Sequence, residues 1–168
     1  MTCLVDHGFA GTTMQRVQTS AGVSRGALVH HFPTMEDLLV GAIGHVARRQ
    51  LDELRVALTP LVGGEDERDR TVRLLHSYMS GPLFLAGLEL WLAARTNPSL
   101  RHALIPIERD LGHELREAFA ADGSHQLVTP ADLDQLLVVL RGLAITSVLR
   151  PDTTAENQVI ERWLARVS

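Results

Sequence analysis

The chain has 168 residues, a formal net charge of −4 at pH 7 and one cysteine. Its length suffices for one good core, or for one small and one medium-sized unit. The single cysteine, Cys3, excludes an intrachain disulfide framework and a zinc site built from cysteines. The negative charge argues against a chain that binds nucleic acid over its whole surface.

The first predicted element is the end of a helix that stops at Gly8. Residues 12–32 then predict two very short helices joined by a tight turn. Thr13 is a good N-cap for the first of them, and Ser24 is one for the second. Gly22 stands where the first helix needs a left-handed residue, a conformation that glycine adopts without a side-chain clash. This order of elements is the plan of a helix-turn-helix, whose second helix enters the DNA major groove.

The same stretch carries a family resemblance, because several short motifs agree in order and spacing over roughly residues 4–45. The motifs are Gly8-Phe9, Thr12-Thr13, Ala21-Gly22-Val23-Ser24-x-Gly26, and His31-Phe32 followed by Leu38-Leu39. Together they resemble the N-terminal domain of a TetR-family transcriptional regulator. The resemblance implies an all-helical C-terminal body, dimerisation and a small-molecule effector. In this family the first helix is longer, so we expect its first turns to be missing here.

The residues on or beside the two short helices are expected to face DNA. The predicted DNA-contacting residues are Thr13, Gln15, Ser24, Arg25, Gly26, Ala27, Val29, His30 and His31. Arg25 suits a bidentate contact to guanine, or otherwise a phosphate contact; the alternative is an ordinary solvated arginine. The hydroxyls of Thr13 and Ser24 can also reach phosphates. His30 and His31 are adjacent, so on a helix they point about 100° apart and cannot chelate one metal ion together.

Three residues depart from the pattern of the family. Val29 replaces the usual tyrosine of the second short helix, and Met35 replaces the usual lysine at the start of the next helix. Gln18 stands where a small residue is customary. A lysine at that position contacts a DNA phosphate. Its loss should therefore reduce the slope of the logarithm of the binding constant against the logarithm of the salt concentration by about one per protomer. These departures leave open a second hypothesis, a TetR-like dimer that binds ligands or partners but binds DNA poorly.

A long helix is predicted over residues 35–58, because its apolar residues recur with a period of 3.6. At about 1.5 Å per residue it would be roughly 36 Å long, enough to join a DNA-reading head to a body. We expect the domain boundary inside it, with residues 1–46 as the helix-turn-helix domain and 47–168 as the effector-binding and dimerisation domain. Residues 1–50 hold four arginines against three acidic residues, so the negative charge lies in the predicted body.

The rest of the sequence predicts further helices and no strands. Pro60, Gly63 and Gly64 are expected to end the long helix, and Asp122-Gly123-Ser124 to close a later one. The helices expected after residue 60 run from the charged segment 65–70 to about Ser80, from Pro82 to about Thr96, from Pro98 to about Ala121 with a kink at Pro106, from Thr129 to Arg150, and from Thr153 to Val167. The helix from Pro82 is apolar almost all round, which predicts a buried helix. Thr153-x-x-Glu156 predicts a capping box.

The fold class is therefore all-α: a short N-terminal helix-turn-helix domain joined by a long helix to a helical C-terminal domain. The apolar faces of the last two helices, about 131–149 and 155–167, are too extensive for a lone small core and predict a two-fold dimer interface. Its predicted residues are Leu133, Leu137, Leu140, Ala144, Val148, Ile160, Trp163 and Leu164. A dimer would bring two heads to DNA half-sites about 34 Å apart. The alternative is that these faces are all core of a single chain.

An effector pocket in the body is predicted to be lined by Tyr78, Phe84, Trp91 and His113, although each of them is more often plain core. Effector binding would favour a spacing of the heads that no longer matches the operator. The expected partners are a palindromic DNA operator, an effector of unknown identity and a second copy of the chain. The longest apolar run, from Leu136 to Leu149, is too short to span a bilayer, and no signal peptide is visible. We expect a cytoplasmic protein without a membrane partner.

Two motifs are compatible with other chemistry. Gly22-Val23-Ser24-Arg25-Gly26 matches G-x-S-x-G, the nucleophile elbow of α/β-hydrolases. That elbow needs a strand before it and a parallel sheet around it, so a serine hydrolase is a remote alternative. Asp110-x-x-His113 would be half of a metal site in a helical bundle, but a second carboxylate–histidine pair is lacking. We therefore expect no enzyme activity, no metal and no cofactor.

Overall fold

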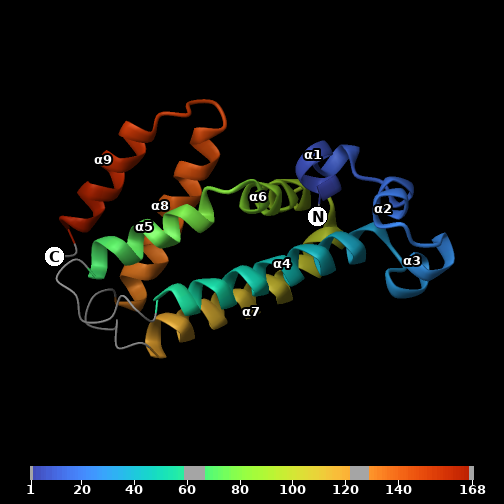
Figure 1. Cartoon of the computed structure of the whole chain (residues 1–168), viewed down its shortest axis with the longest axis horizontal. Helices are drawn as coiled ribbons and strands as arrows, with labels where there is room; N and C mark the ends of the chain where they lie inside the picture. Colours follow the sequence, from blue (N-terminus) through green and yellow to red (C-terminus); the bar gives the residue numbers. More distant parts are fainter. Residues whose placement is uncertain (1, 59–66, 122–128, 167–168) are drawn as a thin grey trace. The chain divides into compact units, whose positions relative to one another are not determined.

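The computed structural model describes residues 2–58, 67–121 and 129–166, and the regular elements in these ranges are all helices (Figure 1). The elements are α1 (Thr2–Gly11), α2 (Met14–Ala21), α3 (Arg25–His31), α4 (Met35–Leu58), α5 (Glu67–Met79), α6 (Pro82–Ala94), α7 (Pro98–Ala121), α8 (Pro130–Ser147) and α9 (Thr153–Leu164). The all-α prediction is confirmed. The turns predicted at Pro60, Gly63 and Gly64 and at Asp122-Gly123-Ser124 lie outside the described residues, as does Val167.

The chain forms two compact units, and each unit is built from two segments. The first unit comprises residues 1–49 and 82–112, and the second comprises residues 50–81 and 113–168. The helix-turn-helix therefore shares its unit with α6 and with the first part of α7. The long helix α4 begins in one unit and ends in the other, so the division falls inside this helix.

The first unit has an aliphatic core to which α1, α4, α6 and α7 all contribute. Its buried residues are Leu4, Leu39, Val40, Ile43, Ala86, Leu90, Ala94, Leu100 and Leu104. Two glycines of α4 allow close packing at its surface. A Cβ on Gly41 would lie 2.9 Å from the ring of Phe32, and one on Gly44 would lie 3.3 Å from Ile107. The residue that ends the helix-turn-helix, Phe32, thus packs directly on the backbone of α4.

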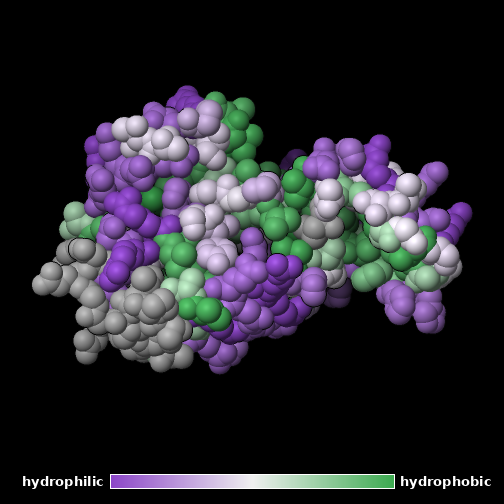
Figure 2. Space-filling model, in the orientation of Figure 1, coloured by the Kyte–Doolittle hydropathy of each residue, from purple (hydrophilic) through white to green (hydrophobic). Residues whose placement is uncertain are grey.

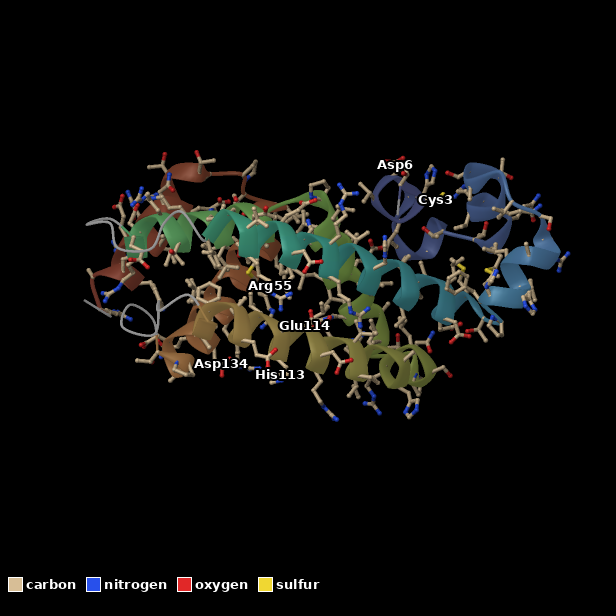
Figure 3. All side chains as sticks on the ribbon, turned by 60° about the horizontal axis from the view of Figure 1, so that its bottom comes forward. Cys3, Asp6, Arg55, His113, Glu114 and Asp134 are labelled. Carbon is tan, nitrogen blue, oxygen red and sulfur yellow. The ribbon has the colours of Figure 1, made fainter. Side chains whose placement is uncertain are left out.

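The second unit is assembled around α5 and α8. Both α8 and α9 pack against α5, and the buried residues of these helices include Val72, Leu75, Met79, Leu133, Leu136, Leu137, Leu140, Ala144, Ile160 and Trp163. Polar contacts connect the ends of other helices. The Arg55 guanidinium donates to the backbone carbonyl of Glu114, at 3.2 Å, and Arg116 pairs with Asp134 at 2.8 Å (Figure 3). Both contacts are at least partly open to solvent, so they contribute little stability individually.

Three details differ from the expectations. The helix α6 is not buried all round, because Leu92 is 63% exposed and Trp91 is 36% exposed. The helix α8 ends at Ser147 rather than Arg150, because the N–H groups of Leu149 and Arg150 both bond to the carbonyl of Thr146 and close the last turn. These differences are both at surfaces, where apolar periodicity gives the least information.

The third difference is the cap of the last helix. The N-cap of α9 is Asp152, whose carboxylate accepts from the N–H groups of Thr154 and Ala155 at 3.0 and 3.2 Å. The predicted capping box on Thr153 and Glu156 is therefore wrong. A carboxylate one residue earlier reaches two orphan N–H groups at the positive end of the helix, which a threonine hydroxyl at the first helical position does not. Glu156 instead lies 3.6 Å from Nε2 of His76 on α5.

Candidate nucleic-acid interface

The helix-turn-helix is organised by its caps. The Thr13 hydroxyl accepts from the N–H of Arg16 at 3.2 Å, and the Ser24 hydroxyl accepts from the N–H of Ala27 at 3.2 Å. Gly22 ends α2 in the left-handed conformation, with φ 65° and ψ 26°. The two predicted caps and the predicted left-handed glycine are thus confirmed. They set the angle at which the chain leaves α2 and enters α3.

The predicted DNA-contacting residues all belong to the solvent-exposed surface of α2, α3 and their caps. Thr13, Gln15, Ser24, Arg25, Gly26, Ala27, Val29, His30 and His31 are all exposed. Within α3, Leu28 is the buried residue, at 8% exposed, and it anchors the helix. A short helix that buries one leucine and exposes its other side chains has the form needed to enter a groove of DNA.

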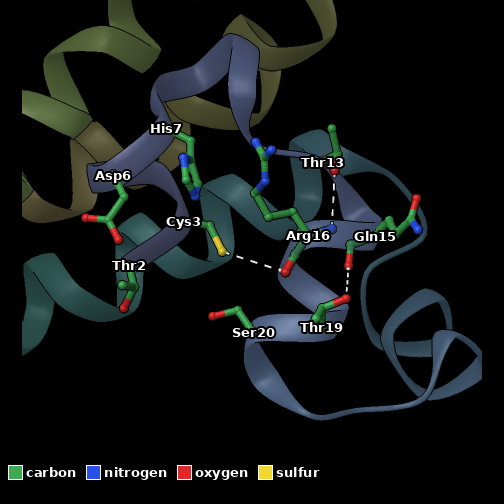
Figure 4. A pocket seen from close by; sticks show the side chains of 9 residues that line it. All are labelled: Thr2, Cys3, Asp6, His7, Thr13, Gln15, Arg16, Thr19 and Ser20. Carbon is green, nitrogen blue, oxygen red and sulfur yellow. Dashed lines mark hydrogen bonds between the residues drawn. The ribbon is translucent and has the colours of Figure 1, made fainter.

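A polar groove lies beside this surface, between α1 and α2 (Figure 4). Its volume is about 460 Å³, and it is lined by Thr2, Cys3, Asp6, His7, Thr13, Gln15, Arg16, Thr19 and Ser20. Two of the predicted DNA-contacting residues, Thr13 and Gln15, belong to its wall. The Arg16 side chain donates to the carbonyl of Gly11, so its guanidinium is held at the edge of the groove. Hydroxyls, amides and a guanidinium are groups that bind phosphate oxygens.

Sequence reasoning assigned no structural role to Thr12, yet its side chain fixes the approach to α2. Thr12 is 6% exposed, and its hydroxyl lies 2.6 Å from the carbonyl of Gly8 and 3.1 Å from that of Cys3. It therefore joins α1 to the residue that precedes the α2 cap. The only signal in the sequence was the pair Thr12-Thr13. The Thr12 hydroxyl contacts carbonyls of α1, whereas the Thr13 hydroxyl caps α2.

The four residues predicted to line an effector pocket belong to different units. Phe84 and Trp91 lie on α6 in the first unit, whereas Tyr78 and His113 lie in the second. The indole Nε1 of Trp91 donates to Glu108 at 2.7 Å, and Nε2 of His113, with its side chain 72% exposed, lies 3.2 Å from Glu117. Tyr78 and Phe84 are half-buried. The pocket itself thus stays a prediction.

Most of the residues predicted at a dimer interface are buried within the single chain. Leu133, Leu137, Leu140, Ala144, Ile160 and Trp163 are all at most 6% exposed, and Leu164 is half-buried. As they stand, these six side chains offer no surface to a second copy, in line with the alternative that they are core. The eighth predicted residue, Val148, is 63% exposed. Three other apolar residues of α8 and the turn after it are also exposed: Val138 at 66%, Ile145 at 48% and Leu149 at 86%. Figure 2 shows hydrophobic surface where α8 turns toward α9.

The two motifs compatible with other chemistry have ordinary structural roles. Ser24 follows the helix α2 and caps the helix α3, so the G-x-S-x-G sequence joins two helices and lacks the strand of a nucleophile elbow. His113 pairs with Glu117 on its own helix. In the described ranges no group of three or more histidine, cysteine or acidic side chains is placed to hold a metal ion. Nor does any described helix combine the length and apolarity needed to cross a membrane.

Comparisons with known proteins agree with this architecture. Residues 1–42 match the family model described as bacterial regulatory proteins, tetR family. A helix-turn-helix transcriptional regulator of Mycobacterium tuberculosis is 25% identical over 161 residues, which cover 94% of this chain and 83% of the relative. The transcriptional repressor AcnR of Corynebacterium diphtheriae is 32% identical over 116 residues, which cover 68% of this chain and 56% of AcnR.

Solved structures extend the similarity to nearly the whole chain. The multidrug binding protein EbrR in complex with ethidium superimposes with a TM-score of 0.71 at 25% identity, covering 96% of this chain and 91% of EbrR. A TetR family member from Streptomyces coelicolor A3 gives a TM-score of 0.69, also at 25% identity, with the same coverage of both chains. With its helix-turn-helix and its helical body both matched, the chain belongs to the TetR family of transcriptional regulators.

Proposed function

We propose that the chain is a dimeric repressor that binds a palindromic operator and leaves it when a small molecule binds. The observation that carries the proposal is the exposed surface of α2 and α3, where the predicted DNA-contacting residues are all accessible on a capped helix-turn-helix. Arg25 is proposed to contact guanine or a phosphate. Such a regulator acts where the chromosome is, which places it in the cytoplasm.

The test is a fluorescence-anisotropy titration against the DNA upstream of the protein's own gene, at two salt concentrations, with random DNA as the control. Arg25→Ala should weaken binding about tenfold while leaving unfolding unchanged, because the side chain is exposed. The matched control is Arg162→Ala on α9, which removes the same charge from an exposed position outside the helix-turn-helix. Equal affinity for both DNAs, or equal effects of the two substitutions, would contradict the proposal.

Dimerisation is proposed to use the exposed apolar residues of α8 rather than its buried ones. Val138 and Ile145 lie seven residues apart on one face of α8, and Gly142 between them has open space above its backbone. Ile145→Arg would place a charge in the proposed interface. We expect light scattering coupled to size-exclusion chromatography to give a dimer for the wild type and a monomer for this variant, and operator affinity to fall with it.

The proposed effector is a small molecule whose binding shifts the population toward a form that does not fit the operator. Support comes from EbrR, a relative at 25% identity whose structures contain ethidium and proflavin. Phe84 and Trp91, which lie together on α6 in the first unit, remain the proposed contacts. The test compares how strongly ethidium or proflavin releases labelled operator with how strongly uncharged aromatic compounds of similar size do so. Stronger release by ethidium or proflavin would mean that the chain shares the ligands of EbrR.

A second candidate is a dimeric ligand-binding module with weak DNA affinity. It is favoured by two observations at the proposed DNA-binding surface. Val29 puts an apolar side chain, 44% exposed, on the surface of α3, and Met35 packs against the core instead of presenting a charge. Under this candidate, effectors bind and the dimer forms, but upstream and random DNA bind equally weakly in the titration above.

A further inference from the structure

The first helix contains a break that only a glycine can adopt. Gly8 has φ 66° and ψ −178°, so the helical residues Phe9–Gly11 begin again after an interruption. Residues that restart a helix have N–H groups without a partner in their own turn. The N–H of Phe9 has a partner from elsewhere, because it donates to Oε1 of Glu89 on α6 at 2.6 Å, across 80 residues of sequence.

The fit between Gly8 and Glu89 is close. A Cβ built on Gly8 would lie 2.7 Å from Glu89 Oε1, closer than a real Cβ can come. The carboxylate is half-buried, and it accepts a hydrogen bond of the charge-assisted kind, which is stronger than one between neutral groups. Consistent with this contact, α1 and α6 pack against each other (Figure 1). Glu89 therefore caps a helix turn that belongs to another part of the sequence.

The break leads directly to the helix-turn-helix. The carbonyl of Gly8 accepts from the N–H of Thr12 at 3.1 Å and is within 2.6 Å of its hydroxyl. The next residue, Thr13, is the N-cap of α2. Only three residues thus separate Phe9, which contacts the carboxylate, from Thr13, the cap of the first short helix.

A second polar contact holds the other end of the module. Asn97 accepts from the N–H of Leu100 through its Oδ1, at 3.0 Å, and so caps α7. Its amide Nδ2 donates to Oε1 of Glu36 at 3.0 Å. Glu36 lies in the first turn of α4, directly after the helix-turn-helix. Both contacts lie within the first unit.

From these contacts we infer that Glu89 and Asn97 are positioning residues for DNA binding. Glu89, on α6, and Asn97, the cap of α7, set the orientation of α2 and α3 by holding the residues that lead into and out of these two helices. Neither side chain lies on the proposed DNA-binding surface. The inference rests on the proposed DNA binding. It names two residues that neither the sequence motifs nor the exposed surface had connected with DNA binding.

The experiment uses the full chain and two readouts, operator affinity by anisotropy and amide hydrogen exchange of residues 8–13. Glu89→Leu removes the acceptor, and we expect exchange at Phe9 and Thr12 to accelerate and operator affinity to fall, each about tenfold, the size typical of a hydrogen bond to a charged group. Glu89→Gln keeps an acceptor of the same shape, so it should recover most of the affinity. Asp110→Asn, at an exposed position on α7, removes the same charge as Glu89→Gln and should leave both readouts unchanged.

Asn97→Asp gives an independent test that keeps the cap of α7. The carboxylate still accepts from Leu100 but faces Glu36 without a donor, so operator affinity should fall while the unfolding midpoint stays close to that of the wild type. Wild-type affinity and wild-type exchange in both Glu89→Leu and Asn97→Asp would overturn the inference. If the wild type itself prefers no DNA, the proposed function fails and the role in DNA binding fails with it. Hydrogen exchange of residues 8–13 then still tests separately whether Glu89 holds the segment that leads into α2.

Discussion

Residues 13–31 and the helix α8 are stabilised by different means. Within residues 13–31, Leu28 is the one residue that is buried, and the chain is ordered by two side-chain caps and a left-handed glycine. The eighteen residues of α8 bury five side chains: Leu133, Leu136, Leu137, Leu140 and Ala144. Burying one large apolar side chain contributes about 1.5–3 kcal/mol, whereas one cap contributes about 1 kcal/mol.

The difference shows how the proposed DNA-binding surface can coexist with few buried side chains of its own. Side chains that are not needed for packing are available for contacts with DNA. Local hydrogen bonds then hold the backbone, and the core of the first unit is provided by α1, α4, α6 and α7. The body does the reverse, since the inner face of α8 is used for packing and its outer face is left apolar at Val138 and Ile145. Each of the following substitutions tests one side of this comparison.

The largest effect is expected from Leu140→Ala, because Leu140 is completely buried in α8. The lost contacts and the remaining cavity should lower the free energy of unfolding by about 2–5 kcal/mol. Urea denaturation followed by circular dichroism measures this change. Val56→Ala, at a position 75% exposed, is the control and should change the same free energy by less than about 0.5 kcal/mol. Equal losses in the two variants would mean that burial does not dominate the stability of the body.

Gly22→Ala comes next. A Cβ on Gly22 meets no atom within 4 Å, so the cost is the backbone strain of a left-handed alanine, about 1–2 kcal/mol. The loss should be local and visible as faster hydrogen exchange of Val23, whose N–H bonds to the carbonyl of Gln18.

Gly26→Ala is the matched control for that substitution. Its Cβ also meets open space, but Gly26 lies inside α3, where alanine is preferred over glycine by about 0.5–1 kcal/mol. Protection should therefore stay the same or increase. If Gly22→Ala is tolerated as well as Gly26→Ala, the turn does not depend on the left-handed residue.

Removal of the α9 cap should have a smaller effect. Asp152→Ala leaves two N–H groups without their acceptor and should cost about 1 kcal/mol in the free energy of unfolding. Thr153→Ala removes the residue that the sequence motif indicated, and it should cost much less. Thermal unfolding of both variants decides between the two assignments, and a larger loss for Thr153→Ala would restore the predicted capping box.

The smallest effect is expected from Asp134→Ala. The ion pair between Arg116 and Asp134 is about half exposed on both sides, so water and salt screen it. The free energy of unfolding should fall by no more than about 0.5 kcal/mol in dilute buffer and less at high salt. If Asp134→Ala lowers the free energy of unfolding as much as Asp152→Ala does, surface ion pairs stabilise the protein as much as helix caps do.

The local features of the helix-turn-helix could be predicted from the sequence. The hydrogen bonds of a helix cap and of a left-handed glycine join residues that are at most about four positions apart. The predicted bounds of α4 and α7 match the structure, in which Thr34 and Asn97 cap the starts of these two helices. Periodicity also predicted that α8 has an apolar face, but it does not say what covers that face. Of the interface residues chosen from it, Leu133, Leu137, Leu140 and Ala144 are buried within the single chain.

Contacts between distant segments were beyond prediction from a single sequence. Glu89 meets Phe9 across 80 residues, and nothing in the spacing of α6 marks that carboxylate as a cap for another helix. The cap of α9 was missed on a smaller scale, because two adjacent residues, Asp152 and Thr153, are both good caps and only the backbone geometry selects between them.

The lone anchor of α3 has a consequence for the diversity of operators. Leu28 holds the helix against the core. Four other residues of the helix are exposed and are not part of the core: Arg25, Ala27, Val29 and His30. Those four positions can therefore change together without a penalty in folding, both over evolution and in a laboratory library. A selection that keeps Leu28 and the caps fixed and randomises these four positions should yield folded variants with altered operator preference.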